Sequence, residues 1–174
     1  MAGIGSGTVV DGGVSTPFSG VSFSVTALGD TSTYYDNTGV AHGTFVSTAS
    51  ITADGHTALL DVQPGEFFFV TEGANPGVAG FGNLHNSSMP GYILAASNFD
   101  SYDAVSDTGP FSIDVLKFDD LQTKAGPDIF FDSINRATFT AFVPEPATWA
   151  MMLVGFGGLG ALLRRRARTA VAAV

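Results

Sequence analysis

The chain has 174 residues, no cysteine and a formal net charge of −9. Residues 1–143 contain three basic and 15 acidic residues, a net charge of −12, whereas residues 144–174 carry +3. An acidic body argues against nucleic acid as a partner, because phosphate contacts need clustered Lys and Arg. The absence of cysteine excludes disulfides, thiolate nucleophiles and cysteine metal sites. The fold must therefore be stabilised by its core, and about 140 residues suffice for one domain.

Most of residues 8–143 alternates apolar and polar side chains with a period near two. Seven strands are expected, at residues 21–28, 44–52, 58–62, 66–71, 92–97, 111–118 and 137–143. Turns are expected at Asp11-Gly12, Asn37-Thr38-Gly39, Asp54-Gly55 and Pro64-Gly65. Residues 72–90 and 98–110 are expected to be long loops. The pattern predicts an all-β fold: an antiparallel β-sandwich or jelly-roll-like domain over residues 1–143, with its strands within residues 8–143.

An acidic loop in this domain is a weak candidate for calcium binding. Asp100, Asp103 and Asp107, and the pair Asp119-Asp120, could offer carboxylate oxygens to Ca²⁺. None of them fits the spacing of an EF-hand, and solvated carboxylates on an acidic surface are the simpler interpretation. The sequence therefore predicts no bound metal and no cofactor.

The sequence also gives little support for catalysis. His42, His56 and His85 do not match a helical metal motif, and there is no Gly-x-Ser-x-Gly elbow for a nucleophilic serine. We expect that the protein is not an enzyme. Paired carboxylates of a glycosidase stay an open alternative, because sequence spacing does not reveal their separation in space.

Four tyrosines suggest a second possible role. Aromatic rings stack on the apolar faces of sugars, and a sugar-binding surface could use Tyr34, Tyr35, Tyr92 and Tyr102. Tyrosines at the edges of a sandwich are more often packing residues. Both interpretations stay open on sequence alone.

The last 31 residues have the organisation of a membrane segment. Ala147 to Leu163 is 17 residues without a charge, which as a helix would span about 25 Å of a hydrocarbon core of about 30 Å. Trp149 lies near one end, and a basic cluster of four arginines closes the other: Arg164, Arg165, Arg166 and Arg168. The charge asymmetry predicts a C-terminus in the cytoplasm and an exported N-terminal domain. A buried core helix is the alternative, but four glycines between residues 155 and 160 disfavour it in water.

Pro144-Glu145-Pro146, followed by Trp149-Ala150-Met151 and the arginines, resembles the PEP-CTERM sorting signal in its PEPxxWA variant. The resemblance covers residues 144–168. It implies a sorting motif at 144–146, a membrane helix at 147–163 and a basic tail at 164–168. It also implies processing by an exosortase, a membrane enzyme of exopolysaccharide-producing Gram-negative bacteria. The two prolines should keep the motif extended and accessible.

These features predict an exported, non-catalytic cell-surface or matrix protein, held in the inner membrane as a precursor and linked to exopolysaccharide. A carbohydrate-binding module is the alternative, and a secreted hydrolase is a third. Export also leads us to expect a signal peptide, but residues 1–7 have neither a basic start nor an apolar core. Either the start has been assigned too late or that segment is absent from this sequence.

Overall fold

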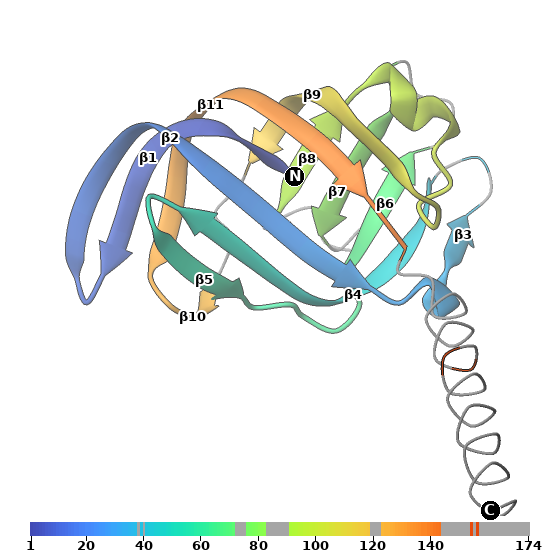
Figure 1. Cartoon of the computed structure of the whole chain (residues 1–174), viewed down its shortest axis with the longest axis horizontal. Coiled ribbons are helices and arrows are strands. Elements are labelled where there is room, and N and C mark those ends of the chain that lie inside the picture. Colours follow the sequence, from blue (N-terminus) through green and yellow to red (C-terminus); the bar gives the residue numbers. More distant parts are fainter. Residues whose placement is uncertain are drawn as a thin grey trace, which may run out of the picture. The chain divides into compact units, whose positions relative to one another are not determined.

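The structure, a computed structural model, describes residues 1–37, 39, 41–71, 76–82, 91–118, 123–143, 154 and 156 (Figure 1). Residues 1–142 form one compact unit, and residues 143–174 form a second. In its described part, the regular secondary structure of the first unit consists of strands and two short 3₁₀ turns. This confirms the predicted all-β class. The two units are described separately.

The strands of the first unit follow one another along the chain, with two short 3₁₀ turns between them. The strands are β1 (Ala2–Asp11), β2 (Val14–Gly29), β3 (Tyr35–Asn37), β4 (Ala41–Ala53), β5 (His56–Leu60), β6 (Phe67–Thr71), β7 (Val78–Gly82), β8 (Tyr92–Ala95), β9 (Thr108–Phe118), β10 (Thr123–Ala125) and β11 (Asp128–Ala141). The 3₁₀ turns are η1 (Thr31–Thr33) and η2 (Ser97–Ser101). All the pairings between these strands are antiparallel.

Eight strands close into a ring, which corrects the expected sandwich of two separate sheets. The order around the ring is β4, β2, β1, β11, β9, β8, β7, β6 and back to β4. Closure depends on two strands that change partners along their length. In β4, residues 41–45 pair with β6 and residues 46–53 with β2. In β9, residues 108–113 pair with β11 and residues 114–118 with β8. β4 therefore joins β2 to β6, and β9 joins β11 to β8. These two links close the eight strands into a ring without a free edge.

Strand β1 was not predicted, although it lies at the centre of the sheet between β2 and β11. Its glycines allow this position. A Cβ atom at Gly3 or Gly7 would collide with the backbone carbonyl of Arg136 or Phe130 on β11. The expectation that all strands lie within residues 8–143 is therefore wrong.

β3, β7 and β10 were not predicted either, and glycine explains why β7 was missed. β7 lies inside the expected loop of residues 72–90, and its Gly80 packs beneath the ring of Phe69 on β6. In contrast, the turn predicted at Asp54-Gly55 is confirmed. Asp54 and Gly55 have φ values of 49° and 77°, and they join β4 to β5 as a two-residue hairpin. The expected loop of residues 98–110 contains most of η2 and the start of β9.

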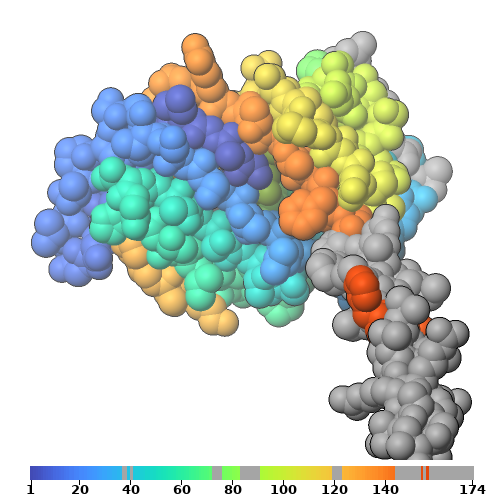
Figure 2. Space-filling view, viewed as in Figure 1, coloured from blue at the N-terminus to red at the C-terminus, as the bar shows by residue number. Residues whose placement is uncertain are grey.

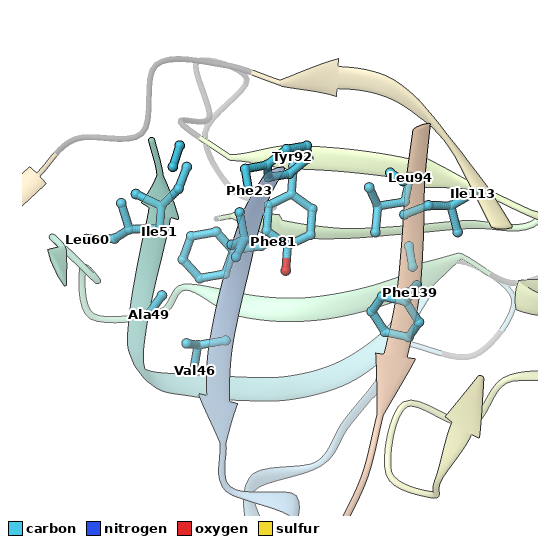
Figure 3. Packing of buried hydrophobic residues seen from close by; sticks show 14 of the residues in the cluster. Phe23, Val46, Ala49, Ile51, Leu60, Phe81, Tyr92, Leu94, Ile113 and Phe139 are labelled. Carbon is cyan, nitrogen blue, oxygen red and sulfur yellow. The ribbon is translucent and has the colours of Figure 1, made fainter. Parts of the chain in front are cut away.

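The core fills the ring with aromatic side chains. Figure 3 shows Phe23, Phe81 and Tyr92 pointing inward from β2, β7 and β8. Near the other end of the core the ring of Phe139 stacks on that of Phe68, with centroids 5.5 Å apart. Because Phe68 points inward, Phe67 and Phe69 lie on the outer face of β6. Both are nevertheless buried, so this strand is apolar on its two faces.

Candidate functional site

The candidate site has two parts: an apolar end of the folded unit, and the sorting segment that follows it. We call the first part the aromatic rim. It consists of five exposed apolar side chains, Leu28, Tyr34, Tyr35, Phe45 and Phe142.

Strand register places the outer members of the rim at the same end of the sheet. Ala2 of β1 pairs with Ser24 of β2 on one side and with Thr138 of β11 on the other. Leu28 and Phe142 each lie four residues beyond these partners, so both lie at the end of the sheet beyond Ala2. Two strand spacings separate β2 from β11 here, or about 10 Å. Figure 2 shows the orange end of β11 beside the blue end of β2.

A network of hydrogen bonds fixes η1 between β2 and β3. Asp30 Oδ1 accepts the Ser32 N–H at 2.9 Å and thereby caps η1, while the Thr33 hydroxyl donates to the Asp30 carbonyl at 2.6 Å. Phe45 N–H donates to the Thr33 hydroxyl at 3.2 Å, which holds η1 against β4. Hydrogen bonds from the Ser32 side chain and backbone lower the pKa of the Asp30 carboxyl. The turn is therefore capped by Asp30 and anchored on β4.

The rings of the rim rest on buried neighbours. Tyr35 and Phe45 contact Phe67, with ring centroids 6.1 and 6.0 Å apart. Tyr34 packs against His42 at 6.0 Å, and His42 Nε2 lies 2.8 Å from the Tyr102 carbonyl oxygen, to which it donates when that nitrogen carries the proton. The rings of Tyr34, Tyr35 and Phe45 are thus held in place by packing against residues of the folded unit.

The four tyrosines do not form one surface. Tyr34 and Tyr35 are exposed, whereas Tyr92 and Tyr102 are buried in the core. Burial raises the pKa of Tyr92, and burial together with Asp103 and Asp107 raises the pKa of Tyr102 to about 12. A sugar-binding face built from all four tyrosines is therefore excluded.

The candidate calcium ligands do not form a cation site. Among the residues with described positions, no group of three His, Asp or Glu side chains could hold a metal ion, so Asp100, Asp103 and Asp107 do not make one. Asp103 serves its own loop instead: its Oδ1 accepts the N–H groups of Val105 and Ser106 and the Ser106 hydroxyl, at 2.8–3.0 Å. Partial burial raises the pKa of Asp103, but these hydrogen bonds outweigh it, and the net pKa is lowered.

Other candidates from the sequence are separated or fall in parts of the chain left undescribed. His42 lies on β4 beside Tyr102, and His56 begins β5, so the two do not share a site. The structure does not describe His85 or the pair Asp119-Asp120.

Most of the sorting segment also lies outside the described residues. This holds for the motif and for the basic cluster: Pro144, Glu145, Pro146, Trp149, Arg164, Arg165, Arg166 and Arg168. Of the expected helix at 147–163, only Val154 and Phe156 are described, and both are helical and exposed. Within the described parts of the chain, we find no helix with the length and apolar character needed to cross a membrane.

The sequence analysis did not predict that the five rim residues lie at one end of the sheet. Its signal was the run Tyr34-Tyr35, but Leu28 and Phe142 are 114 residues apart in the chain, and only strand register brings them to one end.

The order of an all-β domain, a proline motif, an uncharged stretch and arginines is that of an exported domain with a C-terminal sorting signal. The family model described as the PEP-CTERM protein-sorting motif matches residues 142–166, which confirms the resemblance expected for this segment. The protein thus carries an exosortase-type signal for export. Comparisons with curated proteins and with solved structures find no match to the chain.

Proposed function

We propose that the chain is the precursor of a non-catalytic cell-surface or matrix protein. Residues 147–163 hold it in the inner membrane, an exosortase processes it near Pro144-Glu145-Pro146, and the domain then functions in the exopolysaccharide layer. The observation that carries this proposal is the sorting motif directly behind the last strand. β11 ends at Ala141, and the match to the sorting motif begins at residue 142.

A structural rather than catalytic role is supported by how the polar groups of the domain are used. The Asp103 carboxylate organises its own loop, as described above. The buried Glu66 carboxylate accepts the Gln63 N–H at 3.0 Å within the link from β5 to β6. Asp30 caps η1. Each of these carboxylates accepts hydrogen bonds from its own turn and is already committed to partners within the chain.

Carbohydrate binding is less well supported than it was on sequence alone. Two of the four tyrosines that could have lined a sugar site are core residues, and only Tyr34 and Tyr35 of the four are exposed. A glycan array with the full-length protein tests this alternative directly.

The proposal is tested by intact-mass analysis of the protein from exosortase-positive and exosortase-negative cells. We expect a shortened C-terminus near residues 144–146 only when the enzyme is present. Replacing Glu145→Ala should abolish the shortening, while the control Asp132→Ala, which removes an exposed carboxylate from β11, should not. A C-terminus at Val174 in both strains would contradict processing and leave a permanent anchor.

A further inference from the structure

We propose that the aromatic rim rests on the lipid surface of the membrane while the precursor is anchored. The inference rests on the membrane-held precursor of the proposed function and assigns a contact surface to its folded domain. The partner is the headgroup region of a bilayer.

The rim concentrates the apolar surface of the folded unit. The exposed fractions are 58% for Leu28, 44% for Tyr34, 42% for Tyr35, 41% for Phe45 and 73% for Phe142. These five are half of the ten large apolar side chains exposed in the described part of residues 1–142, and the other five lie on five different strands, β1, β2, β5, β9 and β11. Single exposed apolar residues are ordinary, but a cluster at one end indicates an interaction surface.

The length of the connecting chain identifies the membrane as the partner. β11 ends at Ala141, and five residues, 142–146, separate it from the start of the expected membrane helix. Five residues reach about 18 Å when fully extended. The end of the sheet that carries Leu28 and Phe142 therefore cannot move far from the bilayer before processing. Tyrosine is enriched at membrane interfaces, since its ring is apolar and its hydroxyl stays hydrated.

The charge of the rim favours a lipid surface as its partner over a second copy of the chain or an anionic polysaccharide. The chain has no Lys or Arg before Lys117, so β2, η1, β3 and β4 add no cation to the rim. Two acidic residues belong to the same segment: Asp30 caps η1, and Asp36 follows Tyr35 on β3. Two copies docked rim to rim would bring these carboxylates together, which is unfavourable. An anionic polysaccharide would find no positive charge here. A zwitterionic lipid surface meets neither obstacle.

The absence of cysteine allows a direct test with full-length protein. Thr31→Cys places a single fluorescent label on exposed η1 at the rim, and Ser15→Cys places it on the β1–β2 hairpin at the opposite end of the sheet (Figure 1). Each labelled protein is reconstituted into phosphatidylcholine vesicles that carry a nitroxide quencher on their headgroups.

We expect quenching at Thr31 to exceed quenching at Ser15 by about threefold, because only the rim reaches the headgroups. The double variant Leu28→Ser/Tyr35→Ser should reduce quenching at Thr31 to the Ser15 level. The control Val14→Ser/Leu116→Ser, which removes two exposed apolar side chains outside the rim, should leave it unchanged. Thermal unfolding of each variant checks that the fold is retained.

The outcomes separate the two proposals. Protein that does not float with the vesicles would overturn the membrane-held precursor, and the rim contact with it. Protein that floats, but shows equal quenching at Thr31 and Ser15, would overturn the rim contact alone. A Thr31 label that responds to a neutral polysaccharide and not to vesicles would assign the rim to a glycan instead.

Discussion

Glu66 shows how one residue couples the fold to pH. Its side chain is 4% exposed in the link between β5 and β6, and its backbone carbonyl accepts the Val46 N–H at 3.1 Å. Burial raises the pKa of the Glu66 carboxyl, the Gln63 N–H partly opposes this, and the charge of Asp61 raises it again. Folding therefore favours the protonated form of Glu66. At neutral pH, ionisation of this carboxyl lowers the free energy of unfolding.

Glu66→Gln should accordingly stabilise the protein at neutral pH relative to the wild type. The folded state holds the proton more tightly than the unfolded state. Wild-type stability therefore falls as pH rises from the ordinary glutamate pKa through the raised one. Gln has no such loss, and the gain should be on the order of 1 kcal/mol at pH 7.5 and vanish near pH 4. Urea unfolding at both pH values measures it, with Asp132→Asn as the exposed control. A difference that does not change with pH would contradict this assignment.

At the scale of elements, sequence patterns succeeded where side chains alternate and failed where glycine dominates. β4, β6 and β9 were predicted, and β-branched and aromatic residues are frequent in them. Asp54-Gly55 was predicted correctly as a turn. β1 and β7 were missed, since glycine usually signals a turn and here permits close backbone contact.

Two further features were beyond reach for different reasons. Closure of the sheet depends on partner changes within β4 and β9, which leave no pattern in the local sequence. The sorting motif was readable because it is contiguous. The tyrosines were not, because similar residues face solvent at Tyr34 and the core at Tyr92.

The central place of β1 leads to a prediction for this strand. A variant that lacks residues 1–7 should lose its cooperative unfolding transition, because β2 and β11 lose their shared partner and Phe23 and Phe131 lose backbone cover. Thermal unfolding followed by near-ultraviolet circular dichroism measures this loss. Removal of residues 167–174, which lie beyond the matched sorting motif, is the control and should leave the transition intact. Native-like unfolding of the shortened N-terminal variant would show that β1 is dispensable.

At the scale of the whole molecule, charge divides the chain into an acidic domain and a basic tail. The −12 charge of residues 1–143 favours solubility, and in the membrane-held precursor that we propose the tail arginines would stay at the cytoplasmic side. The anchoring role of the uncharged stretch between them is testable without reference to the enzyme.

Leu153→Asp/Val154→Asp should abolish flotation of the full-length protein with vesicles. Each carboxylate near the centre of a membrane helix costs about 2.5–3.5 kcal/mol on insertion scales. Thr169→Asp/Ala170→Asp adds the same charge beyond the arginines and should still float. Equal flotation of both variants would mean that residues 147–163 do not insert.

The way in which β11 continues into the sorting segment also has a mechanical consequence. In the membrane-held precursor that we propose, a pull from the membrane would act on the C-terminal end of this strand. β11 is hydrogen-bonded to β1 through residues 128–138 and to β9 through residues 137–141. A load along a strand shears its cross-strand hydrogen bonds together, whereas a load across a hairpin opens them one after another. A load applied along β11 would thus act on both rows of hydrogen bonds together, and the membrane-held precursor that we propose should stay folded under such a load.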